Sequence, residues 1–378
     1  MWNLDDLDLA QRRVLRPVES RSGAFVSVNG ASFVDFSSND YLGLGHCEEL
    51  RQQFRELLLE TSGFGSGGSR LLGGDYTVFH ELENDIASYL VTEAALFFNN
   101  GYQCNLGVIS TLMGKDDVVF MDRLCHASIV DGVKLSGARF FRFRHQDMAH
   151  LEELLHRHRG NFSRALIVTE SVFSMDGDIS PLIQISALKN RYQCAIMVDE
   201  AHAVGVFGDR GAGVISQLGL SGQIDIVVGT FGKALGSSGA FVGVSHELKK
   251  YLIQYCRSFI YSTSLPLPVI LFNRLALRYM QSCGLGSILL EKAELFRSKL
   301  VDLGLSVMGQ SHIVPVMVGS DEDALALSDR FKSHGIWVSA IRPPTVPPGM
   351  SRLRFSLTMH HELDVLDKVV ALFKDRDA

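Results

Sequence analysis

Short apolar runs alternate with helical patterns over residues 94–244 of the chain. Each run is only four or five residues long, and stretches such as 147–158 and 181–192 between the runs have apolar residues at helical spacing. Strands that alternate with helices are typical of a mostly parallel sheet with helices on both faces. We therefore predict an α/β domain whose strands are residues 95–98, 118–121, 139–143, 165–169, 195–198, 224–228 and 240–244.

A different pattern flanks this region. Residues 23–36 alternate as a hairpin that turns at Asn29-Gly30, a pair that favours tight hairpins. After residue 270, long helices lead into short strands, which is typical of a smaller α+β domain. We predict an N-terminal segment (1–45) packed beside that small domain (271–378), and a large domain (46–270). The other predicted helices are 3–16, 48–60, 78–90, 268–282, 286–303, 321–334 and 361–374, and the other strands are 313–318, 336–341 and 352–357.

Composition narrows the class of protein. The chain is 46% hydrophobic and 21% charged, as in ordinary soluble enzymes, and its net charge of −6 gives no reason to expect nucleic acid or a membrane as partner. The six cysteines form no CxxC pair and fit a reducing cytoplasm better than a disulfide framework. The N-terminus shows no secretory signal, and no apolar run approaches 18 residues. We therefore expect a cytoplasmic protein.

Two residues after predicted strands point to a cofactor. Lys233 lies between glycines in residues 229–236 (GTFGKALG), and Asp199 ends the apolar run 194–199. Pyridoxal 5′-phosphate (PLP) needs a lysine for its Schiff base and an acid that keeps the pyridine nitrogen protonated. Parallel sheets bind ligands at the carboxyl ends of their strands, where both residues lie.

Competing interpretations of these motifs lack their required context. Residues 199–202 (DEAH) also match a helicase motif, but no Walker A motif precedes them, and Lys233 is followed by alanine rather than Ser or Thr. The glycine-rich stretch 63–74 lacks the spacing of a dinucleotide fingerprint. His156 and His158 lie on a charged helix without zinc-ligand spacing, so we predict no metal site.

Further candidates follow other strands. Gly101 and Tyr102 lie where backbone N–H groups at a helix start could bind phosphate, although an ordinary strand-to-helix turn is equally compatible. His126 could stack on a cofactor ring, and Ser171 could donate to the cofactor or a substrate, but alone each is more often structural. Arg352 and Arg354 share one face of a strand, so one could bind a carboxylate unless the strand is a solvated edge.

Several motifs in the same order resemble the α-oxoamine synthases, over about residues 9–370. They are residues 37–44 (SSNDYLGL), 65–70 (GSGGSR), 199–202 (DEAH), 230–233 (TFGK) and 261–263 (YST). The resemblance implies the PLP-dependent aspartate-aminotransferase fold (fold type I) and the joining of an amino acid to an acyl thioester. It also implies a homodimer with active sites at the subunit interface.

The resemblance implies a role for each site residue. Lys233 would form the Schiff base and move the proton at the amino acid α-carbon. His126 would stack on the ring, Asp199 would pair with its nitrogen, His202 would contact the 3′-oxygen and Ser171 would lie at the ring edge. The residues implied around the phosphate are Gly101, Tyr102, Thr230 and, from the partner subunit, Thr263. Those implied at the substrates are Asn39 and Arg354 for the amino acid carboxylate, and Arg13 (with Arg12 and Arg16 close by) and Thr345 for the acyl group.

Residues 340–349 (AIRPPTVPPG) most resemble family members that condense L-alanine with a pimeloyl thioester in biotin synthesis. The thiol carrier, coenzyme A or acyl carrier protein, stays open. Sister enzymes such as glycine C-acetyltransferase usually carry Tyr-Pro before the Val-Pro, and a glycine-using member is the first alternative. A non-catalytic partner subunit is the second, but such subunits typically lack the lysine that Lys233 provides.

Overall fold

The computed structural model describes residues 15–61 and 63–374, and the chain forms two compact units. One unit comprises the chain up to Ser38, residues 175–177 and residues from 291 onward. The other comprises residues 39–174 and 178–290. Arg13 and nearly all of the predicted helix 3–16 lie outside the described residues.

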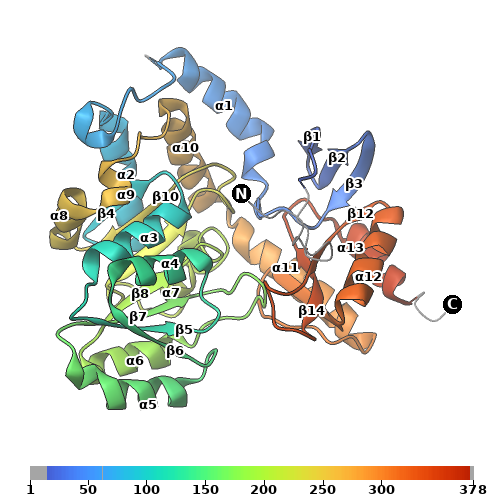
Figure 1. Cartoon of the computed structure of the whole chain (residues 1–378). Helices are drawn as coiled ribbons and strands as arrows, with labels where there is room; N and C mark the ends of the chain where they lie inside the picture. Colours follow the sequence, from blue (N-terminus) through green and yellow to red (C-terminus); the bar gives the residue numbers. More distant parts are fainter. Residues whose placement is uncertain (1–14, 62, 375–378) are drawn as a thin grey trace, which may run out of the picture. The chain divides into compact units, whose positions relative to one another are not determined.

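The unit formed by residues 39–174 and 178–290 is built on a seven-stranded sheet, which confirms the predicted α/β class (Figure 1). The strand order is β4-β10-β9-β8-β7-β5-β6. All neighbours pair in parallel except β10, which is antiparallel to both β4 and β9. The strands are β4 (Ala94–Phe98), β5 (Val118–Asp122), β6 (Arg139–Phe143), β7 (Ala165–Glu170), β8 (Ala195–Asp199), β9 (Ile226–Thr230) and β10 (Ala240–Val244).

The central strands are apolar on both faces because helices cover both faces. Alternate residues such as Val119, Met121, Leu166 and Val168 pack in one cluster with the apolar faces of α3 and α4, which lie together in Figure 1. The helices of this unit are α1 (Glu48–Leu59), α2 (Thr77–Leu90), α3 (Gly101–Leu112), α4 (Ala127–Ser136), α5 (Met148–His158), α6 (Leu182–Tyr192), α7 (Val214–Gln217), α8 (His246–Tyr255), α9 (Arg257–Ile260) and α10 (Leu267–Cys283).

Several element boundaries differ from the prediction, and two of the differences have a local cause. Strand β9 begins at Ile226 rather than at residue 224. At Asp225 the side-chain carboxylate, rather than a backbone carbonyl, accepts the N–H of Ile196 (2.8 Å), and it also forms an ion pair with Lys189 (2.9 Å). Helix α3 begins at Gly101, five residues before residues 106–113, the stretch whose sequence predicts a helix. Its N-cap Asn100 accepts the N–H of Gln103 (2.9 Å), which starts the helix in a polar stretch.

The second unit contains two smaller sheets. In the first, β1 (Ser20–Ser22), β2 (Phe25–Val28), β3 (Ala31–Asp35) and β12 (Ile336–Trp337) pair in that order. The predicted hairpin is confirmed, with Asn29 and Gly30 at positive φ of 52° and 73°. In the second, β14 (Ser351–Ser356) lies between β11 (Ile313–Gly319) and β13 (Ser339–Ile341). Helices α12 (Asp321–Ser333) and α13 (Leu363–Lys374) belong to this unit, and α11 (Leu285–Asp302) includes the boundary at residue 291.

The predicted strand 336–341 is two strands. Residues 336–337 pair in parallel with β3, whereas residues 339–341 pair antiparallel with β14. Val338 separates them, and its carbonyl accepts the hydroxyl of Ser328 (2.7 Å) from α12. The change of pairing partner depends on two distant strands, so the local pattern could not reveal it.

Within the described residues, the six cysteines are free thiols, no group of His, Cys, Asp and Glu could hold a metal ion, and no helix is long and apolar enough to cross a membrane.

Candidate active site

A cavity of about 180 Å³ lies at the carboxyl ends of β8 and β9, beside the start of α3. This is the edge of the sheet at which parallel strands present their ligand-binding residues. The cavity brings together seven residues singled out from the sequence, although they come from four segments of the chain. They are Gly101, Tyr102, His126, Asp199, His202, Thr230 and Lys233.

A tight turn after β9 presents Lys233. Thr230 donates its hydroxyl to the carbonyl of Gly239 (2.9 Å) and accepts the N–H of Gly232 (3.1 Å), while Gly236 donates to the carbonyl of Lys233 (2.8 Å). Gly236 has a φ of 62°, and a Cβ there would overlap the backbone of Gly45. Gly236 therefore reflects close backbone packing rather than a loose loop.

Asp199 enters the cavity as a buried carboxylate with only 6% exposure. One oxygen accepts the side-chain N–H of Asn105 (2.7 Å) and the other accepts the backbone N–H of Ala201 (2.9 Å). Asn105 is itself buried and also donates to Ser128 (3.0 Å). Both bonds to Asp199 come from neutral donors, so they orient the carboxylate without neutralising its charge.

His126 is the N-cap of α4 and stands in the cavity wall. Its backbone N–H donates to Glu170 (2.6 Å), and its Nδ1 lies 2.8 Å from the hydroxyl of Ser128. Burial lowers the pKa of His126, and the nearby charge of Asp199 offsets part of this effect. A lowered pKa favours the neutral imidazole, which suits packing against a flat ring.

His202 is oriented by a hydroxyl. The phenol oxygen of Tyr41 lies 2.7 Å from Nδ1 of His202 and donates to Oδ1 of Asn39 (3.1 Å). This contact orients the imidazole of His202 toward the cavity that it lines. Tyr41 lies in the same SSNDYLGL motif as Asn39 but was not singled out from the sequence.

Glu170 is a second buried acid that lines the cavity and that sequence reasoning missed. Burial, followed by the charge of Asp199, raises its pKa to about 8. Like Asp199, Glu170 ends an apolar strand, so the signal that identified Asp199 could have identified Glu170. Asn105 and Ser128 could not be identified in this way, because each lies inside a helix among other polar residues and does not end an apolar strand.

Other predicted residues of this unit do not line the cavity. Ser171 is fully buried, and its N–H and hydroxyl both point to the backbone carbonyl of Asp199, at 2.9 and 3.4 Å. Thr263 pairs with Ser69 in an isolated bridge, and its carbonyl accepts the side chain of Asn99 (2.7 Å). The side-chain oxygen of Asn39 accepts a hydrogen bond from the hydroxyl of Tyr41.

The remaining predicted residues belong to the other unit. Arg354 and Arg352 are 7% and 1% exposed and lie on β14, the central strand of its sheet, so the edge-strand alternative is wrong. Arg352 forms an ion pair with Asp176 (2.5 Å), whereas Arg354 donates to Ser356 (2.5 Å). Thr345 is exposed, and its N–H donates to the carbonyl of Arg342 (3.0 Å).

Comparison with known proteins identifies the class. The profile of the aminotransferase class I and II family matches residues 31–371, and the chain belongs to this family and, within it, to the α-oxoamine synthases that its motifs resemble. The 8-amino-7-oxononanoate synthase of Geobacter sulfurreducens is 46% identical over 363 residues, which are 95% of this chain and 92% of the relative. The same enzyme of Chlorobaculum parvum is 41% identical and covers 95% of this chain and 93% of its own length.

Solved structures agree with the fold. The serine palmitoyltransferase of S. paucimobilis, solved with a bound PLP–myriocin adduct, has a TM-score of 0.89 at 32% identity and covers 94% of this chain and 90% of that chain. The 8-amino-7-oxononanoate synthase of Francisella tularensis has a TM-score of 0.78 at 29% identity and covers 92% of this chain and 99% of that chain. The predicted fold type I architecture is thus confirmed.

Proposed function

We propose that this protein condenses L-alanine with a pimeloyl thioester, with PLP as cofactor, to give 8-amino-7-oxononanoate, CO2 and the free thiol. This is a step of biotin synthesis. The observation that supports it most is the convergence of Lys233, Asp199 and His126 in one cavity of a chain that is 46% identical to a relative of that name. The new carbon–carbon bond joins the alanine α-carbon to the acyl carbonyl as the thiol leaves, and the alanine carboxylate departs as CO2.

The donor set of the cavity fits PLP. Lys233 provides the amine that attaches the cofactor, and Asp199 provides a buried carboxylate whose two other partners are neutral, so it is suited to a protonated pyridine nitrogen. The start of α3 at Gly101 supplies backbone N–H donors for a phosphate, and Thr230 lines the same cavity. When bound, PLP supplies an electron sink for charge that develops at the amino acid α-carbon.

The chain's own residues then hold and move protons. Lys233 removes the proton from the α-carbon of alanine and returns one after decarboxylation. His126 would pack its imidazole, whose lowered pKa favours the neutral form, against the ring, and His202, oriented by Tyr41, would contact the ring oxygen. For the substrates, we propose that Asn39 and Arg354 bind the amino acid carboxylate and that Arg13 and Thr345 contact the acyl group.

We also propose that the enzyme is a cytoplasmic homodimer in which Thr263 contributes to the phosphate site of the partner subunit. Large apolar side chains are exposed near the Ser69–Thr263 bridge: Leu72 is 86% exposed and Tyr261 is 73% exposed. Exposed apolar residues that lie close together are typical of a protein interface.

A matrix of substrates tests this function. The holoenzyme is assayed with alanine, glycine and serine against acetyl, succinyl, palmitoyl and pimeloyl thioesters, each thioester on coenzyme A and on acyl carrier protein. We expect alanine with the pimeloyl group to give the highest kcat/KM, and we expect the gene to restore growth without biotin to a host that lacks its own synthase. A better pair with glycine and a short acyl group, together with failed rescue, would reject the substrate while leaving the family intact.

A second candidate is a serine-using long-chain acyltransferase, since the structural match to serine palmitoyltransferase reaches a TM-score of 0.89. The higher sequence identity of the 8-amino-7-oxononanoate synthases, 46% against 32%, favours alanine. The serine and palmitoyl arms of the same matrix distinguish the two.

A further inference from the structure

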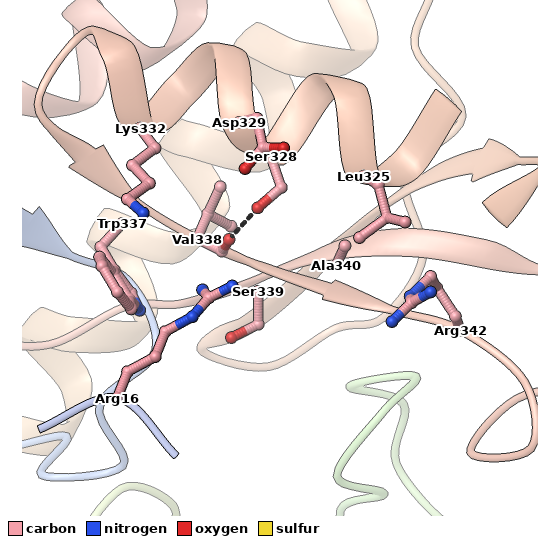
Figure 2. A pocket seen from close by; sticks show the side chains of 10 residues that line it. All are labelled: Arg16, Leu325, Ser328, Asp329, Lys332, Trp337, Val338, Ser339, Ala340 and Arg342. Carbon is pink, nitrogen blue, oxygen red and sulfur yellow. Dashed lines mark hydrogen bonds between the residues drawn. The ribbon is translucent and has the colours of Figure 1, made fainter. Parts of the chain in front are cut away.

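A second cavity, also of about 180 Å³, lies wholly within the unit that contains the N- and C-terminal parts of the chain. It shares no lining residue with the Lys233 cavity. Its walls are one face of α12, the chain path from β12 to β13, and Arg16 (Figure 2). The volume is well above the ~10–15 Å³ that one water needs, so a small molecule fits.

The walls are strongly positive. Arg16, Lys332 and Arg342 line the cavity with a single carboxylate, Asp329, so the lining has three cations against one anion. The chain as a whole has a net charge of −6, so the positive charge of this cavity is opposite in sign to that of the whole chain. A concave surface with excess charge of one sign attracts ligands of the opposite sign.

Two of these cations share one aromatic ring. The guanidinium carbon of Arg16 lies 5.3 Å from the centroid of Trp337, and Nζ of Lys332 lies 5.2 Å from it. Neither cation forms an ion pair with an acid in the described part of the chain. Trp337 is held in place by an edge contact with Phe33 (5.3 Å). Two like charges at one ring repel each other, and an anion between them removes that repulsion.

The positive groups lie at two ends of the cavity. Figure 2 shows Arg16 and Lys332 beside Trp337 at one end, Arg342 at the other, and Ala340 and Leu325 between them. Trp337 and Arg342 are five positions apart, so an extended chain separates their Cα atoms by up to roughly 16 Å, and their long side chains reach inward. A compact anion such as phosphate could meet only one end.

We propose that this cavity binds an α,ω-dicarboxylate, with one carboxylate between Arg16 and Lys332 and the other at Arg342. The aliphatic chain of the ligand lies against Leu325, Val338 and Ala340. The site follows from its own charges and shape. Only the expectation that a seven-carbon acid, pimelate, is among the good ligands rests on the proposed function.

Trp337 gives a direct readout, because the chain has two tryptophans and the other is Trp2. In holoenzyme with Trp2→Phe, tryptophan fluorescence is titrated with pimelate, succinate, heptanoate and inorganic phosphate. We expect a saturable change with pimelate and much weaker binding of heptanoate, which has the same length but one carboxylate. Lys332→Gln and Arg16→Gln should each weaken pimelate binding by about tenfold or more, as expected for the loss of a charge-assisted contact.

Lys368→Gln is the matched control, because Lys368 is 73% exposed in the same unit and does not line the cavity. Its pimelate titration should equal that of the parent. The proposal fails if pimelate gives no saturable change, if heptanoate or phosphate binds as tightly, or if Lys368→Gln loses as much affinity as Lys332→Gln. The titration requires no turnover, so it can succeed when the condensation assay fails, and the reverse.

Discussion

At the scale of single residues, the chemistry of the Lys233 cavity depends on how its two buried acids are held. Asp199 is buried and accepts hydrogen bonds from the side chain of Asn105 and from the N–H of Ala201. Glu170 is more deeply buried, and its carboxylate accepts the backbone N–H of His126. Burial, followed by the charge of Asp199, raises the pKa of Glu170 to about 8, so Glu170 is the poorer partner for a cation.

Asp199→Asn should keep the shape of the cavity and remove its negative charge. We expect turnover to fall on the order of 10²-fold or more, because the ring nitrogen of PLP loses the charge that keeps it protonated. Steady-state kinetics with alanine and the pimeloyl thioester measure the effect. Asp209→Asn, at an 83% exposed carboxylate, is the control and should match the parent. An Asp199→Asn enzyme as fast as the parent would show that Asp199 is not the ring partner.

Glu170 makes a pH-dependent contribution to stability. Its folded pKa of about 8 lies above the ordinary 4.5, so the folded state binds more protons than the unfolded state between these values. Stability from this group is therefore present at low pH and is lost as pH rises toward 8. Glu170→Gln keeps an acceptor for His126 and cannot ionise. Urea unfolding of the apo-protein from pH 5 to 8 should show the variant gaining stability relative to the parent as pH rises. Parallel curves would contradict the buried-acid assignment.

At the scale of elements, the strands and the residues directly after them could be predicted from the sequence. Runs such as 118–121 and 165–169 are apolar throughout because both sheet faces are covered, and Asp199 and Lys233 follow such runs. Helix α4 was not predicted, because it begins at the polar His126 cap rather than at an apolar pattern. The side-chain direction of Ser171 and the contact of Tyr41 with His202 depend on tertiary packing, which periodicity does not encode.

The turn that presents Lys233 depends on a close approach between two loops. In Gly236→Ala the new Cβ would overlap the backbone of Gly45, at a φ of 62°. We expect a loss of about 1–3 kcal/mol in unfolding free energy, as for overpacked sites, together with weaker PLP retention. Gly219→Ala is a sharp control, because Gly219 has a φ of 67° with nothing near its Cβ position. If urea unfolding shows the same loss of unfolding free energy in both variants, the destabilisation of Gly236→Ala comes from backbone strain at positive φ rather than from contact with Gly45.

At the scale of the whole molecule, the proposed dimer makes each active site depend on two chains. Lys233 and Asp199 lie in one cavity of one chain, whereas Thr263 lies outside that cavity. This difference could not be judged from one sequence, since no pattern along the chain tells which subunit a residue serves. It can be tested by mixing inactive variants.

Lys233→Ala and Thr263→Asp proteins are mixed, denatured together and refolded. Random pairing makes about half of the dimers heterodimers, and each heterodimer has one intact site out of two, so the mixture should recover about a quarter of parental activity. The acquired carboxylate of Thr263→Asp repels phosphate in the partner's site. A mixture of Lys233→Ala with Asp199→Asn is the control and should recover nothing, since those residues share a cavity. Equal recovery in the two mixtures, or none in the first, would reject the shared site.

The most direct test of the central claim is to find where PLP attaches. The purified holoenzyme is reduced with borohydride, digested, and its cofactor-labelled peptide is sequenced by mass spectrometry. The account predicts one labelled residue, Lys233, and no trapped cofactor or turnover in Lys233→Ala. A label on another lysine, or a Lys233→Ala enzyme with unimpaired activity, would contradict it.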